Sequence, residues 1–147
     1  MNRTFTKLLV LALLVVTVLS ACTKSANDVL IVSKENLAAN YSPVTVIIKA
    51  SGYPDQDRTN DFYAPCEKDD QIVLRSDLTA TYVDAGTQCT PAGGGSDVWN
   101  LNGNTITISG EDFTIKSLTR STLVLEQSGD IFGSGFVVTA TYTYRRS

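Results

Sequence analysis

The stretch Trp99–Gln127, WNLNGNTITISGEDFTIKSLTRSTLVLEQ, decides the fold of this chain. Apolar residues such as Ile106 and Ile108 alternate with threonines, and a period of two is that of a β-strand with one buried face. Asn102–Asn104 and Ser109–Glu111 interrupt the alternation with residues that tolerate positive φ and so predict tight turns. Short turns make neighbouring strands antiparallel, so the stretch predicts consecutive β-hairpins.

The same pattern extends to both sides and predicts eight strands. They are Val44–Ala50, Gln71–Arg75, Thr79–Asp84, Asp97–Leu101, Thr105–Ser109, Phe113–Leu118, Thr122–Gln127 and Phe136–Arg145. We expect one apolar wall from Val46, Ile48, Ile106, Ile108, Phe113, Ile115, Leu123, Leu125, Phe136 and Val138. Because no long crossover separates the strands, the sequence predicts an all-β fold, an eight-stranded antiparallel up-and-down barrel over residues 43–147, rather than a sandwich.

Two longer loops interrupt the meander, Gly52–Asp70 and Gly86–Ser96, and the second contains the triglycine run Gly93–Gly95. Each loop holds one cysteine, Cys66 or Cys89. In an exported protein such an even pair predicts a disulfide, which would tie the two loops together at one end of the barrel. A reactive or metal-binding pair is the alternative, although zinc needs more cysteine or histidine ligands and the chain has no histidine.

The amino terminus has the pattern of a bacterial lipoprotein signal peptide over residues 1–21. Arg3 and Lys7 precede the apolar run Leu8–Val18, and small residues then lead into Cys22. We expect cleavage before Cys22 and attachment of lipid, palmitate included, to this cysteine. An uncleaved anchor with a fortuitous cysteine is the alternative. Thr23 follows Cys22, where an aspartate would favour retention at the inner membrane, so we expect a lipid-anchored protein of the outer membrane.

Residues 22–42 are expected to form a polar tether followed by a short helix of about two turns capped by Ser33. Cleavage would take the formal charge from −3 to −5, and the basic residues are scattered, which argues against a nucleic-acid partner. The mature length fits one domain, which we expect to be a monomer without a cofactor.

The chain also resembles the bacterial lipocalin-like domain family of secreted lipoproteins. The resemblance rests on Cys66–Asp70 before a strand, on Leu78–Tyr82, on Cys89, and on the ordered motifs Trp99–Ile108 and Ile115–Leu125. It covers about residues 43–145. Two departures are Val44-Thr45-Val46 in place of a glycine-threonine-tryptophan group and Leu78 in place of the usual turn aspartate-glycine.

This resemblance implies an eight-stranded barrel and a disulfide between Cys66 and Cys89, but it supplies no ligand. Eight-stranded barrels are either filled by their own side chains or hold one small molecule. Aromatic side chains are the candidates for ligand binding: Tyr82, Trp99, Phe113, Phe136 and Tyr142. The alternatives are that Trp99 is a core plug at one end of the barrel and that the tyrosine rings are buried with their hydroxyls at the rim.

Asp55, Asp57, Thr59 and Asp61 have the alternate spacing of a calcium loop, but Asn60 and Cys66 stand where an EF-hand needs glycine and glutamate. A solvated acidic loop is therefore the prediction, and the same holds for Glu67, Asp69 and Asp70. The alternative is that oxygens from two loops joined by a disulfide converge on a cation, but we assign no metal site. The sequence shows no catalytic residue set, since serines and threonines lack a histidine base, so no enzyme activity is expected. Two functions stay open: non-covalent binding of a small apolar or amphipathic molecule, or a solid barrel whose loops bind an envelope protein or glycan.

Overall fold

The computed structural model describes residues 28–147. The predicted signal peptide, Cys22 and most of the predicted tether therefore lie outside the described residues. Within residues 28–147, no helix is long and apolar enough to cross a membrane.

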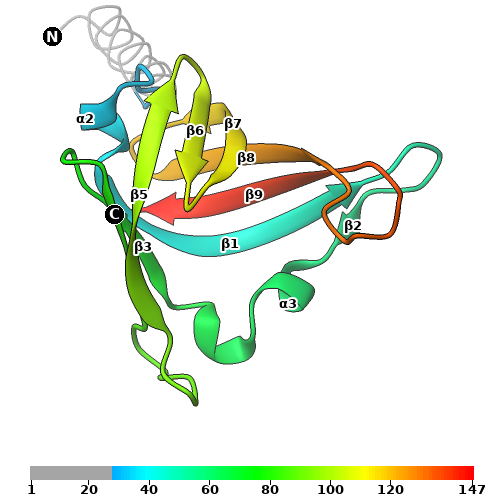
Figure 1. Cartoon of the computed structure of the whole chain (residues 1–147), viewed down its shortest axis with the longest axis horizontal. Coiled ribbons are helices and arrows are strands. Elements are labelled where there is room, and N and C mark those ends of the chain that lie inside the picture. Colours follow the sequence, from blue (N-terminus) through cyan, green and yellow to red (C-terminus); the bar gives the residue numbers. More distant parts are fainter. Residues whose placement is uncertain (1–27) are drawn as a thin grey trace, which may run out of the picture.

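The described part of the chain forms one antiparallel sheet that closes on itself, as Figure 1 shows. Its strands are β1 (Ala39–Lys49), β2 (Gln56–Asp57), β3 (Gln71–Leu74), β4 (Thr79–Val83), β5 (Gly94–Asn102), β6 (Thr105–Ile108), β7 (Glu111–Leu118), β8 (Thr122–Gly129) and β9 (Val138–Arg146). From β3 to β9 each strand pairs with the next, and β1 pairs with both β3 and β9. The eight predicted strands and the predicted meander are confirmed, and the two-residue β2 is an addition at the edge of β1.

The first and last strands close the ring. Their register runs from Tyr41 opposite Arg146 to Lys49 opposite Thr139. β1 begins at Ala39, five residues before the predicted start at Val44, and passes through Pro43. Proline cannot donate a ladder hydrogen bond, and the register shifts between Pro43 and Thr45, so a bulge accommodates it within the strand.

A one-turn helix, α2 (Lys34–Leu37), covers one end of the barrel. The Ser33 side chain accepts a hydrogen bond from the Asn36 amide, as predicted, although the helix is shorter than the two turns expected. Leu37 is fully buried, and the Tyr41 hydroxyl donates to its carbonyl at 2.9 Å. We call this the closed end of the barrel.

Trp99 fills the core at the same end. Its ring is 2% exposed, its indole N–H donates to the Arg75 carbonyl at 2.9 Å, and its backbone N–H donates to the Leu78 carbonyl. Leu78 has a φ of 70°, which shows that the turn between β3 and β4 keeps a left-handed position although leucine stands there instead of glycine. The prediction of Trp99 as a ligand contact is thus wrong, and the alternative of a core plug is correct.

The barrel interior is filled by side chains. Eight of the ten predicted wall residues are buried, Phe113 is half-buried, and Phe136 is the exception. A void inside the barrel has a volume of about 10 Å³ and is lined by Tyr41, Ile72, Leu74, Ile108, Leu123, Leu125 and Tyr144. A void of that size holds no more than one water molecule, so no small molecule fits there.

Three further details differ from what the sequence predicts. Phe136 is 74% exposed and precedes β9, because that strand begins only at Val138. Gly94 and Gly95 belong to β5 rather than to a loop, and φ values of 131° and 153° explain why glycine is needed at this strand start. The loop Gly52–Asp70 also contains two short helices, α3 (Thr59–Phe62) and the 3₁₀ helix η1 (Pro65–Glu67).

Replacement of Trp99 by alanine should lower the free energy of unfolding by about 3–5 kcal/mol, because it leaves a cavity in the core and removes the hydrogen bond from the indole to the Arg75 carbonyl. Val98, the adjacent residue, is 68% exposed, so Val98→Ala should change stability by less than about 0.5 kcal/mol. Urea unfolding followed by circular dichroism measures both variants. Equal effects of the two substitutions would contradict the role of Trp99 as a plug.

Candidate ligand-binding site

The end of the barrel opposite α2 is open, and the loops after β1, β4 and β8 surround it. β1 pairs with β3 only from Ala39 to Tyr41, and the two strands then separate. The segment 58–70 bridges the gap and is hydrogen-bonded to β1. The backbone amide of Arg58 donates to the Val46 carbonyl, and the Val46 amide donates to Thr59 Oγ1, both at 2.9 Å. In Figure 1, α3 and the chain after it lie on the opposite side of the β1–β9 pair from α2.

A pocket of about 320 Å³ lies where β1 and β3 separate, and we call it the mouth pocket. Its wall is mostly apolar and aromatic, with a few polar side chains at its rim. The lining residues are Pro43, Phe62, Tyr63, Glu67, Asp70, Gln71, Ile72, Tyr82, Val83, Gly93, Gly94 and Tyr144. An apolar cleft of this volume with few polar groups has the composition of a small-molecule site.

Two tyrosine hydroxyls meet in the wall of this pocket. Tyr63 follows α3 and Tyr144 lies on β9, and their hydroxyl oxygens are 3.0 Å apart. Burial raises the pKa of both phenols, that of Tyr144 well above its ordinary value. Both hydroxyls are therefore protonated at neutral pH and can donate or accept hydrogen bonds.

The disulfide joins the two loops at the rim of the mouth pocket. Cys66 of η1 is bonded to Cys89 of the β4–β5 loop, with 5.3 Å between their Cα atoms, as the sequence predicts. Glu67 and Asp70, which follow Cys66 in the chain, and Gly93, which follows Cys89, all line the pocket. In the chain-entropy model a bridge over 23 residues stabilises the fold by about 3 kcal/mol.

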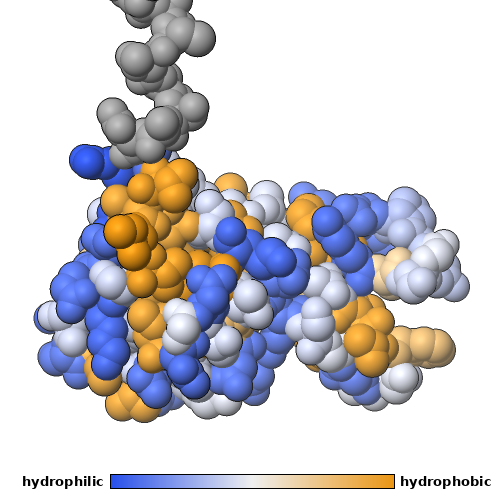
Figure 2. Space-filling view, turned by 90° about the horizontal axis from the view of Figure 1, so that it is seen from above, coloured by the Kyte–Doolittle hydropathy of each residue, from blue (hydrophilic) through white to orange (hydrophobic). Residues whose placement is uncertain are grey.

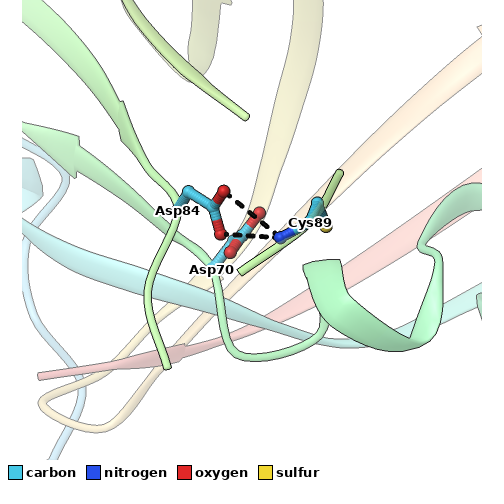
Figure 3. Close-up of side chains that lie close together, drawn as sticks. All are labelled: Asp70, Asp84 and Cys89. Carbon is cyan, nitrogen blue, oxygen red and sulfur yellow. Dashed lines mark hydrogen bonds between the residues drawn. The ribbon is translucent and has the colours of Figure 1, made fainter. Parts of the chain in front are cut away.

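Carboxylates beside the disulfide fold the β4–β5 loop. Asp84 accepts hydrogen bonds from the amides of Cys89 and Gly93, and Asp70 accepts one from Ala85. Figure 3 shows the side chains of Asp70 and Asp84 next to Cys89. Ligand atoms of these three residues lie within 4.8 Å of one another, but the Cys89 sulfur is in a disulfide and is no thiolate ligand. We assign no metal site here.

The acidic residues with calcium-loop spacing have local partners. Asp57 Oδ1 accepts from the Thr59 amide and hydroxyl at the start of α3. Asp61 pairs with Arg58 at 2.8 Å, and Asp55 pairs with Lys49 at 3.4 Å. These side chains are exposed and do not converge on one point, which agrees with the prediction of a solvated acidic loop.

A second, more polar groove lies on the other side of Phe62. It has a volume of about 540 Å³ and is lined by Glu111, Phe113, Gln127, Ser128, Gly129, Asp130, Ile131 and Tyr142. The Phe62 ring lines the mouth pocket and packs edge-on against Tyr142, with 5.7 Å between ring centroids. Tyr142 in turn packs on Phe113 at 5.6 Å.

The five predicted ligand residues therefore do not form one site. Tyr82 lines the mouth pocket and its hydroxyl is 2.7 Å from Ser109 Oγ. Phe113 and Tyr142 line the second groove. Trp99 is buried in the core, and Phe136 is exposed to solvent beyond both pockets. The structure thus places Tyr82 alone, of these five, in the mouth pocket.

Sequence analysis missed Phe62 and Tyr63 and assigned Glu67 and Asp70 to a solvated loop. All four line the mouth pocket and none is fully exposed. The signal for the aromatic pair was its position in an otherwise polar loop, three residues before Cys66. Because the predicted Cys66–Cys89 disulfide ties this loop to one end of the barrel, the aromatic pair could have been expected to pack against that end.

Comparison with known families agrees with this geometry. The family model described as a lipocalin-like domain matches residues 34–125, which is more than half of the chain. No curated protein and no solved structure matches the chain.

The buried tyrosines predict a loss of stability at alkaline pH. Burial, with Tyr63 and Glu111 nearby, raises the pKa of Tyr142 to about 12. The neutral phenol is favoured in the folded state, so its stabilising contribution is complete below the unfolded pKa of about 10 and is lost as pH rises towards 12. The urea midpoint should therefore fall over this range, and less steeply in Tyr142→Phe. The same decline in both proteins would contradict the assignment.

Proposed function

The chain belongs to the lipocalin-like domain family, and from this premise we propose that it binds a small amphipathic molecule non-covalently in the mouth pocket. The observation that carries the proposal is the pocket of about 320 Å³ between β1 and β3, which is lined by four aromatic rings. Its volume is at the lower end of the range for small-molecule sites, so it suits a compact ligand rather than a long acyl chain.

The filled interior restricts where this ligand can lie. Since the void inside the barrel has about 10 Å³, the ligand occupies the open end rather than the barrel axis. Ile72 and Tyr144 border both spaces and separate the pocket from the interior. The hydroxyls of Tyr63 and Tyr144 supply hydrogen bonds for a polar group of the ligand.

We also propose that Cys22 carries lipid and anchors the protein to the outer membrane. Support comes from the closed end of the barrel, where Val29 and Ile31 are 67% and 83% exposed. Figure 2 shows apolar surface gathered on one part of the barrel body. Because the described chain begins at the closed end, an anchored protein would present the mouth pocket away from the bilayer.

A second candidate is an interaction module that binds an envelope protein or glycan through its loops. The observation that favours it is an exposed apolar group on the β8–β9 loop, where Phe132, Phe136 and Val137 are 51–74% exposed. Exposed apolar patches of this kind often mark contact surfaces. Ligand binding is preferred because the mouth pocket, unlike this loop, is enclosed by several elements.

Val83→Trp should block the mouth pocket, because Val83 lines it and the larger indole would occupy its space. The neutral dye N-phenyl-1-naphthylamine should bind the unaltered protein with enhanced fluorescence. It should bind at least about tenfold more weakly to Val83→Trp, a difference of about 1.4 kcal/mol. Val98→Trp is the matched control, since Val98 is exposed on β5 outside the pocket. Unchanged binding in Val83→Trp, or no binding to the unaltered protein, would contradict the proposal.

Expression of the full chain in a bacterial host tests the anchor. The amino-terminal peptide should begin at Cys22 and carry acyl chains by mass spectrometry, and the protein should fractionate with the outer membrane. Cys22→Ser should abolish acylation and release the protein from membranes, whereas Ser25→Ala should change neither. An unacylated Cys22 in the unaltered protein would overturn this part of the proposal.

A further inference from the structure

We propose that the mouth pocket selects cationic ligands, that is, amines or quaternary ammonium compounds with a compact apolar body. The inference rests on the proposed function, because it specifies the chemical class of the molecule that the same pocket takes. Three features support it: the charge of the loops around the open end, two carboxylates at the rim of the pocket, and the aromatic rings in its wall.

The two ends of the barrel differ in charge. The open-end segments 50–70, 84–93 and 130–137 contain eight acidic and two basic residues. The closed-end segments 28–38, 75–78, 119–121 and 145–147 contain three acidic and five basic residues. A concave site surrounded by charge of one sign concentrates counter-ions, so the open end attracts cations and repels anions.

Glu67 and Asp70 bring negative charge to the pocket itself. Both side chains are half-buried and line the pocket. Glu67 Oε2 accepts from the Ala64 amide and Asp70 Oδ1 accepts from the Ala85 amide. Within the described residues 28–147, neither carboxylate has a salt-bridge partner, and the second oxygen of each accepts no hydrogen bond.

The nearby basic side chains are engaged elsewhere. Lys68, next to Glu67, donates to Asn60 Oδ1 at 2.6 Å. Arg58 pairs with Asp61 and also donates to Gln56. A carboxylate oxygen of Asp84 lies within 4.8 Å of one of Asp70, so these two like charges repel each other. A bound cation would relieve this repulsion as well as pair with Asp70.

The aromatic wall supplies a second attraction for a cation. Phe62, Tyr63, Tyr82 and Tyr144 all line the pocket. A positive charge over the face of such a ring is attracted by its quadrupole, most strongly where water is excluded. The same rings bury the apolar body of the ligand, so one compact molecule can use both interactions. An anion of equal size would face two carboxylates, and none of the described residues that line the pocket is a lysine or an arginine.

Three probes with one aromatic body test the inference: naphthalen-2-ylmethylammonium, naphthalen-2-ylmethanol and 2-naphthoate. Their dissociation constants for the full chain are measured by calorimetry at low ionic strength. The cation should bind about tenfold more tightly than the neutral alcohol, and the carboxylate should bind more weakly than the alcohol. Added salt should reduce the preference for the cation.

Glu67→Gln and Asp70→Asn each keep an oxygen that can accept the existing backbone hydrogen bond but remove the charge. Each should reduce the preference for the cation about threefold, and the double variant should remove most of it without weakening the binding of the alcohol. Asp77→Asn is the matched control, because Asp77 also accepts a backbone hydrogen bond but lies at the closed end. It should leave the preference unchanged.

The outcomes separate this inference from the proposed function. If the alcohol and the cation bind equally well and Val83→Trp blocks both, the pocket is a binding site and its proposed charge selectivity is wrong. If none of the three probes binds, both the proposed function and the inference fail. A preference for the cation that is undiminished in the double variant would also overturn the assignment to Glu67 and Asp70.

Discussion

The pairing of β1 with β9 is the constraint on which the rest of the structure depends. It joins the first and last long strands of the meander over residues 41–49 and 139–146, so the sheet closes into a ring. Closure turns the apolar face of every strand inward, and Ile106, Leu123 and Ala140 are almost fully buried as a result. The opposite faces, rich in threonine, remain in contact with water.

β1 also creates the candidate site, because it is longer than the part that can pair with β3, its neighbour on the other side. β3 follows β1 only as far as Tyr41, and β2 takes up the edge again at Ile47. Between these pairings the segment around α3 crosses the gap and is held by Val46 and by the Cys66–Cys89 bridge. The pocket therefore results from incomplete strand pairing at the open end, whereas the interior is filled.

The fold could be predicted from sequence because its signals are local. The alternation of apolar and polar residues and the turn residues in Trp99–Gln127 determine the hairpins. Cys66 and Cys89 lie in loops that the strand pattern defines. The candidate site could not be predicted in the same way, because Phe62 and Tyr144 are 82 residues apart and meet only through the closure of the ring. Phe136 was wrongly predicted to lie in the last strand, because apolar residues continue from Val138 back to Val137 and Phe136 although β9 begins only at Val138.

Cross-strand nuclear Overhauser effects between β1 and β9 test the central claim most directly. A closed ring predicts contacts between the backbone protons of Val46 and Tyr142 and of Ile48 and Ala140, together with slow hydrogen exchange of amides along both strands. If these contacts are absent while those between β8 and β9 are present, the sheet is open. The filled interior and the pocket beside β1 would then both be wrong.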